Sequence, residues 1–207
     1  MMQDDLNALR RIAEEGRDLP LMGGRHFLIW GIALPVAGIY HWAVVSGHID
    51  APGWTLTLSW FGLAGFATII GRMIGARRGQ GHATETSASR VERGVWAAAG
   101  ATFAILAIGL LLHASLGPQS GAAGRFAFFV MLAPMTFGIY AIAINASAVA
   151  TNALWMRPYV ALSFAFAAVT ILMLSSPWLY LVYAIGIAAI SIPLGVALVR
   201  REGASRG

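Results

Sequence analysis

The 207-residue chain contains no cysteine and no lysine, and all of its basic residues are arginine. Without cysteine it cannot form a disulfide, a thiolate metal site, an iron–sulfur cluster or a cysteine nucleophile. Without lysine it cannot hold retinal or pyridoxal phosphate as a Schiff base, nor build the lysine-containing phosphate loop of nucleotide-binding proteins. The motifs of common serine and zinc hydrolases are also missing. We therefore expect a protein that is not an enzyme and carries no cofactor.

Charged side chains are scarce as well. Only 11% of the residues are charged and 58% are hydrophobic, whereas soluble domains are about 25% charged. The apolar residues form runs long enough to cross a hydrocarbon layer of about 30 Å. The sequence predicts an all-α, polytopic transmembrane bundle of about six helices. These cover Phe27–Val45, Leu56–Ile74, Val95–His113, Phe126–Ala148, Tyr159–Ser175 and Leu179–Val199.

The polar segments divide the chain into three parts. Residues 1–25 are predicted to form a cytoplasmic amphipathic helix and a linker, and residues 200–207 a cytoplasmic tail. Between them, residues 26–199 form the transmembrane domain. Within it, residues from about 76 to 93 are rich in Gly, Ser and Thr, which predicts a cytoplasmic loop.

The arginines predict the orientation. If the N-terminus is cytoplasmic, every arginine except Arg125 falls in a cytoplasmic segment, as the positive-inside rule requires. Both termini are then cytoplasmic. The same placement explains the net charge of +5, so the expected partner is the lipid bilayer and not nucleic acid. Abundant Ala, Gly and Arg are typical of GC-rich bacterial genomes, which favours a multi-pass protein of the bacterial inner membrane.

Tryptophans support the same spans. Most lie near predicted helix ends, where the apolar ring and the polar N–H both find suitable surroundings. Trp60 alone lies well inside a span.

Two segments 100 residues apart resemble each other. Residues 24–40 and 124–140 share Gly24/Gly124, Arg25/Arg125 and Tyr40/Tyr140, among other matches. A true repeat predicts two three-helix halves inverted in the membrane, as in secondary transporters. A chance match in an Ala- and Gly-rich chain is the alternative.

The spans contain no Asp or Glu, which argues against a proton-coupled pump. Neutral polar groups and prolines are the remaining candidates for contact with a substrate, either directly or through helix kinks. These positions are Pro35, Tyr40, Pro134, Tyr140, Asn145 and Pro193. Ordinary helix packing is the alternative, because proline is common in membrane helices.

The N-terminal segment offers a docking surface. Leu6, Leu9 and Ile12 fall on one helical face, with Arg10 beside them. This face is expected either to dock a cytosolic protein, such as an ATPase, or to rest on lipid headgroups. Small residues such as Gly71 and Gly75 allow close helix packing, within the chain or in a homo-oligomer.

Histidines on the predicted periplasmic side are the only metal candidates. His41 and His113, with His48 and Asp50, match no known ligand spacing. His41 and His113 are also the only candidate haem ligands. Hydrogen bonding at the interface is the favoured role, and no metal is expected.

Two functions follow from these observations. The first is a non-catalytic scaffold, sensor or regulatory partner that docks a cytosolic protein through its N-terminal helix and the 76–93 loop. The second is a small permease, or a permease subunit, for a neutral or hydrophobic solute.

Overall fold

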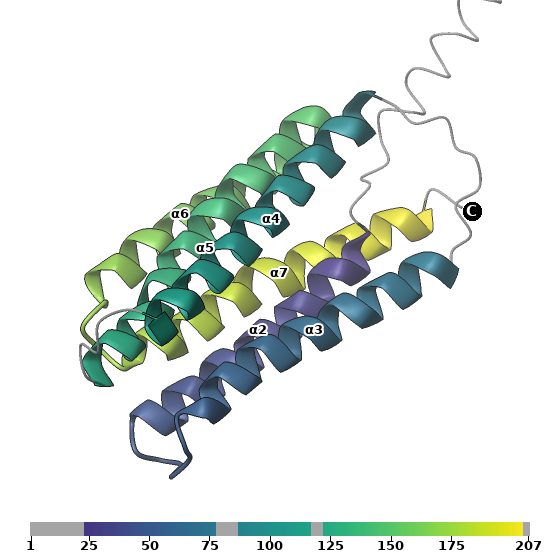
Figure 1. The fold of residues 1–207 in the computed structure, drawn as a ribbon. Coiled ribbons are helices and arrows are strands. Elements are labelled where there is room, and N and C mark those ends of the chain that lie inside the picture. Colours follow the sequence, from purple (N-terminus) through teal and green to yellow (C-terminus); the bar gives the residue numbers. More distant parts are fainter. Residues whose placement is uncertain (1–22, 78–86, 117–121, 205–207) are drawn as a thin grey trace, which may run out of the picture.

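The computed structural model describes residues 23–77, 87–116 and 122–204, and all regular structure in these ranges is helical (Figure 1). The predicted N-terminal amphipathic helix lies outside them. The elements are α2 (Gly24–Val45), α3 (Trp54–Arg77), α4 (Ser87–Leu116), α5 (Ala122–Ala150), the 3₁₀ turn η1 (Leu154–Met156), α6 (Arg157–Leu172) and α7 (Trp178–Ala204). The all-α prediction is confirmed for this part of the chain.

Five helical segments, namely α2, α3, α5, α7 and η1 together with α6, are long and apolar enough to cross a membrane. α4 contains the predicted third span, Val95–His113, as one continuous helix. Large apolar side chains face outward, with Leu172 86% exposed and Ile105 71% exposed. Extensive apolar surface of this kind favours lipid as its solvent, and the bundle is consistent with a multi-pass membrane protein.

The helices extend beyond the predicted spans, most clearly where α4 begins. Residues 87–93 were predicted as loop but belong to α4. They include good helix formers such as Ala88, Arg90 and Glu92, so the helical hydrogen bonding continues past the apolar run. An apolar run marks the hydrocarbon core, and a helix can end well outside it.

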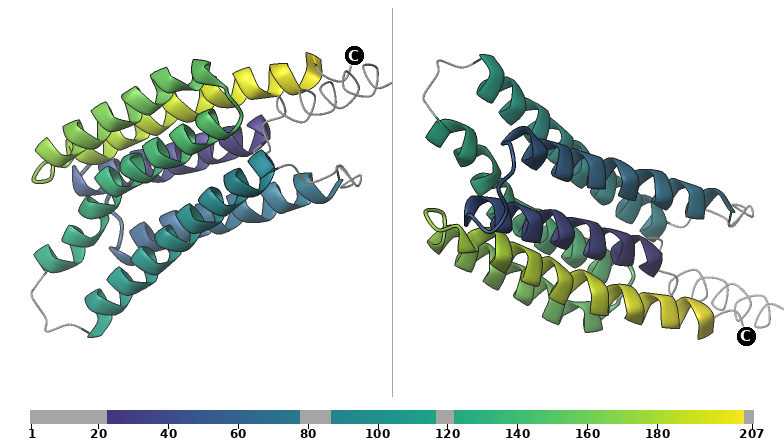
Figure 2. Two further views of the ribbon diagram at one scale, coloured as in Figure 1. Left: turned by 90° about the horizontal axis from the view of Figure 1, so that it is seen from above. Right: turned by 90° about the horizontal axis from the view of Figure 1, so that it is seen from below.

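α2 and α7 run antiparallel and form the most extensive helix pair (Figure 2). Glycines at every seventh position of α2, Gly24, Gly31 and Gly38, face α7. A Cβ atom at Gly24 would lie 2.6 Å from the backbone nitrogen of Val199, and one at Gly31 would lie 2.8 Å from Cβ of Ser191. Small residues at such positions allow two membrane helices to approach closely. This stripe therefore fixes α2 against α7.

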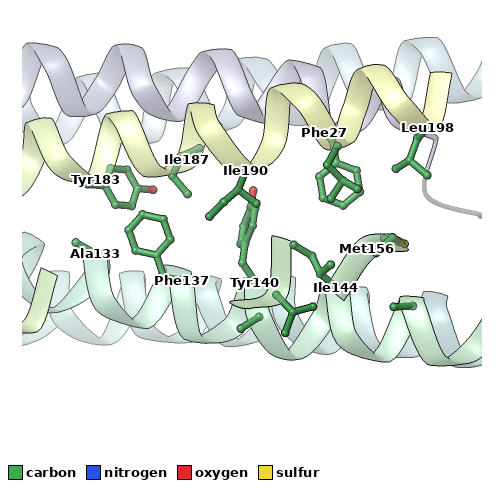
Figure 3. Packing of buried hydrophobic residues seen from close by; sticks show 14 of the residues in the cluster. Phe27, Ala133, Phe137, Tyr140, Ile144, Met156, Tyr183, Ile187, Ile190 and Leu198 are labelled. Carbon is green, nitrogen blue, oxygen red and sulfur yellow. The ribbon is translucent and has the colours of Figure 1, made fainter. Parts of the chain in front are cut away.

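The remaining helices are arranged around this pair. α3 packs on α2, α4 packs on α5, and α6 packs on both α5 and α7. The buried core lies largely between α5 and α7, where Phe137 and Ile144 meet Ile187 and Ile190 (Figure 3). As a result, α3 and α4 are held by different partners on the same side of the bundle.

The start of α2 and the end of α7 lie at the same end of the bundle, where the Gly24 N–H donates to Glu202 Oε1 at 2.7 Å. Arg201 also lies at this end, over the ring of Trp155 at 4.3 Å. We name it the arginine end, because every described arginine except Arg125 belongs to a helix segment there. These are Arg25, Arg72, Arg77, Arg90, Arg93, Arg157, Arg200 and Arg201.

Candidate functional site

A cavity of about 440 Å³ lies between α3 and α4, with α2, α5 and α7 behind it. Its volume falls within the range of about 300–1,000 Å³ that is typical of small-molecule sites. The lining residues are His26, Phe27, Trp30 and Leu34 of α2, Trp60, Phe61, Ala64 and Thr68 of α3, Trp96, Ala99, Gly100, Phe103 and Ala104 of α4, Leu132, Thr136 and Tyr140 of α5, and Tyr183 of α7.

Each helix contributes one face to the cavity, because the lining residues recur at helical spacing. On α4 the lining face runs from Trp96 to Ala104, and on α5 it runs from Leu132 to Tyr140. A helix rises about 12 Å over such a stretch. The cavity is therefore elongated along the bundle.

The mouth of the cavity lies between α3 and α4. Phe61 and Thr68 of α3 and Gly100 and Ala104 of α4 are exposed, whereas the lining residues of α2, α5 and α7 are buried or half-buried. α3 packs on α2 and α4 packs on α5, and both lie on the same side of the bundle (Figure 2). These two helices form the two walls of the opening, because both contribute exposed residues to the lining. In a bilayer, an opening between two membrane helices faces lipid.

Aromatic rings dominate the walls and pack against one another. Trp96 makes edge-to-face contacts with Phe27, at 5.4 Å between centroids, and with Tyr140, at 6.0 Å. Trp60 contacts Tyr183 in the same way at 5.4 Å. Such contacts add to the energy of burial and hold each ring in place. The cavity is therefore lined by rigid rings.

The two central indoles use their N–H groups away from the cavity. Trp60 donates from Nε1 to Nδ1 of His41 at 2.9 Å, and His41 is fully buried and stacked on Tyr180. Trp96 donates from Nε1 to Oγ of Ser147 at 3.0 Å. Because the polar atoms are satisfied elsewhere, these indoles present their apolar surface to the cavity.

The threonine hydroxyls that line the cavity are also engaged within their own helices. Thr68 donates to the carbonyl of Ala64 at 2.8 Å, and Thr136 donates to that of Leu132 at 2.7 Å. The lining contains neither a carboxylate nor a guanidinium group. The cavity itself is therefore suited to an uncharged, largely apolar group, either a small molecule or the apolar part of a larger one.

The positions predicted from sequence to face a substrate are dispersed. Only Tyr140 lines the cavity. The Tyr40 hydroxyl instead donates to Oγ1 of Thr55 at 2.9 Å. The three prolines and Asn145 lie outside the lining: Pro35 is buried, Pro134 is half-buried, and Pro193 and Asn145 are exposed.

The other predicted positions are placed only in part. Nδ1 of His41 accepts the hydrogen bond from Trp60, and His113 belongs to α4. Among the described residues, no group of three or more His, Cys, Asp or Glu side chains comes together. Leu6, Leu9, Arg10 and Ile12 lie outside the described residues, so docking of a cytosolic protein or ATPase through them stays a prediction.

Sequence reasoning missed most of the cavity. Their positions near predicted helix ends place Trp30 and Trp96 at the membrane interface, yet both line the cavity. The one available signal was Trp60, whose place deep inside a span indicates a buried partner for its N–H.

The chain matches no protein-family model, no curated protein and no solved structure.

Proposed function

We propose that this chain binds a hydrophobic molecule that enters the cavity from the bilayer, and that it acts as a small permease or a permease subunit for such solutes. The observation that carries this proposal is the aromatic cavity that opens between α3 and α4. Its walls are rigid, and its polar atoms are largely engaged within the protein. A preformed apolar site of this kind binds through the release of water or lipid and through contact with ring surfaces.

In this proposal the chain has six crossings and the arginine end lies in the cytoplasm of a bacterial cell. Two features support it. Five crossings would leave the start of α2 and the end of α7 on opposite faces of the membrane, yet Gly24 and Glu202 are hydrogen-bonded. If α4 also crosses, both ends fall on the same face, and the positive-inside rule makes that face cytoplasmic. An inverted repeat of two three-helix halves fits this count.

The proposed role is non-catalytic. The polar groups of the lining are His26, Thr68, Thr136, Tyr140 and Tyr183. General acid–base catalysis needs an ionisable side chain within hydrogen-bonding reach of the proton that it transfers, with a pKa near the working pH. The lining offers one imidazole, two tyrosines and no carboxylate, and this scarcity of such groups supports binding without chemical conversion.

Binding can be tested with the neutral apolar fluorophore N-phenyl-1-naphthylamine. Energy transfer from tryptophan to this probe is measured on the purified full chain in detergent. Gly100→Phe fills the mouth, because nothing lies within 4 Å of a Cβ atom at Gly100 and the residue lines the cavity. Gly109→Phe is the matched control, since Gly109 is equally open on α4 but lies outside the lining.

The wild type and Gly109→Phe should bind the probe saturably with similar dissociation constants. Gly100→Phe should weaken binding about tenfold or more, which corresponds to about 1.4 kcal/mol of lost contact. Transfer that rises linearly without saturation in the wild type would overturn the proposal. So would equal binding by the two variants, because it would place the probe elsewhere.

A further inference from the structure

The part of the cavity at the arginine end differs from the rest because exposed arginines lie beside it. Gly71 of α3 packs beside His26 of α2, with a Cβ atom at Gly71 only 3.2 Å from Nδ1 of His26. The lining residues His26 and Thr68 therefore lie near each other at this level. Arg72 follows Thr68 by one helical turn on the same face of α3, and Arg25 directly precedes His26. Both arginines are exposed.

The opposite wall carries positive charge at the same end. Arg90 and Arg93 of α4 precede the lining residue Trp96 by six and three residues, and both are exposed. The two described carboxylates at this end point inward. Glu92 is only 3% exposed, and Glu202 is half-buried and accepts the Gly24 N–H. Among the residues that the structure describes, the exposed charged side chains around the arginine end of the mouth are therefore arginines.

The positive charge of these arginines favours an occupant with a negative headgroup over a cationic occupant. An aromatic cavity can hold a quaternary ammonium group by cation–π contacts, but here a cation would pass exposed arginines and find no carboxylate in the lining. An amphiphile with a negative headgroup meets attraction at the arginines and apolar rings beyond them. Basic pockets between membrane helices at the cytoplasmic side are suited to anionic lipid headgroups.

Building on the proposed function, we propose that the occupant is an anionic phospholipid of the leaflet at the arginine end. One acyl chain enters between α3 and α4 and lies along the cavity, which extends about 12 Å along the bundle. The phosphate remains at the headgroup level beside Arg72 and Arg25. The bilayer supplies this ligand directly, because the mouth opens toward lipid.

The test compares lipid binding by variants of the purified, delipidated full chain. Dioleoylphosphatidylglycerol and dioleoylphosphatidylcholine are added separately in detergent, and bound lipid is counted by native mass spectrometry. Arg72→Gln removes charge at the mouth. Arg157→Gln is the matched control, because Arg157 is an exposed arginine of the same end but belongs to α6, which contributes no residue to the lining.

The wild type and Arg157→Gln should prefer phosphatidylglycerol, and Arg72→Gln should lose about fivefold of that preference, as expected for one arginine at a lipid headgroup. Gly100→Phe should lose the bound lipid. Equal binding of the two lipids by the wild type would overturn the inference, as would equal losses in the two arginine variants. Tighter binding of oleate than of phosphatidylglycerol would also overturn it, in favour of a fatty acid.

The naphthylamine probe separates this inference from the proposed function. Arg72→Gln should bind that neutral probe as the wild type does. If probe binding is saturable and lipid preference is absent, the cavity binds apolar molecules but does not select an anionic phospholipid. If probe binding itself is not saturable, the proposed function fails and this inference fails with it.

Discussion

The hydrogen bond between Trp60 and His41 joins α3 to α2 in the middle of the bundle. His41 is fully buried, and its Nδ1 accepts the indole N–H at 2.9 Å. That contact requires Nδ1 to carry no proton, so it selects the neutral tautomer with the proton on Nε2. Stacking on Tyr180, at 3.8 Å between ring centroids, fixes the imidazole from α7. One imidazole thus connects three helices.

Trp60→Phe should destabilise the folded bundle by about 1–3 kcal/mol, because it removes the indole donor from a buried acceptor. Unfolding of the purified chain by sodium dodecyl sulfate, followed by circular dichroism, measures the change. Trp54→Phe is the matched control on the same helix, since Trp54 is 65% exposed and should tolerate the change. Equal unfolding midpoints for the two variants would show that the hydrogen bond adds nothing to stability.

At the scale of elements, the contact between α2 and α7 is the central one. The glycine stripe of α2 brings the backbones together, and the Gly24 carbonyl would lie 2.8 Å from a Cβ atom at Gly195. A collision with backbone cannot be relieved by a side-chain rotation. The two helices must move apart if either glycine gains a side chain.

Gly24→Ala should therefore lower the free energy of unfolding by about 1–3 kcal/mol, as is typical when a close contact is overpacked. Gly62→Ala has the same chemistry on α3, where nothing lies within 4 Å of a Cβ atom. It should be neutral or slightly stabilising, since alanine favours a helix over glycine. The same detergent unfolding assay compares the two. A loss of stability in Gly62→Ala as large as in Gly24→Ala would contradict the close-packing explanation.

Individual helices were predictable from the sequence because each apolar run carries its own signal. The lengths of the helices were less predictable, since Ala88 and Arg90 continue α4 beyond its apolar run. The cavity was not predictable. Its walls come from five helices, and no local pattern shows that Phe61 of α3 and Phe103 of α4 line one space. Helix–helix packing determines such a site, and hydropathy contains little information about which faces meet.

At the scale of the whole molecule, the directions of the helices bring arginines from several helices to the same end of the bundle. Arg25 at the start of α2 and Arg200 at the end of α7 belong to the same end, and so do Arg72 and Arg157. Asp50 lies in the turn between α2 and α3, at the other end. In the proposed orientation, this asymmetry places the arginine end of the cavity mouth at the cytoplasmic surface of the membrane. The proposed lateral entry of an amphiphile depends on that orientation.

Cysteine accessibility tests the membrane topology most directly, because the chain has no native cysteine to interfere. Single variants His48→Cys, Leu154→Cys and Ser175→Cys mark the exposed turns after α2, α5 and α6. They are treated in intact cells with a membrane-impermeant maleimide and compared with lysed cells. Six crossings with the arginine end inside predict labelling of the variants at 48 and 175 in intact cells, and of the variant at 154 only after lysis. Labelling at 48 and 154 but not at 175 would mean that α4 does not cross, and it would contradict the proposed bundle.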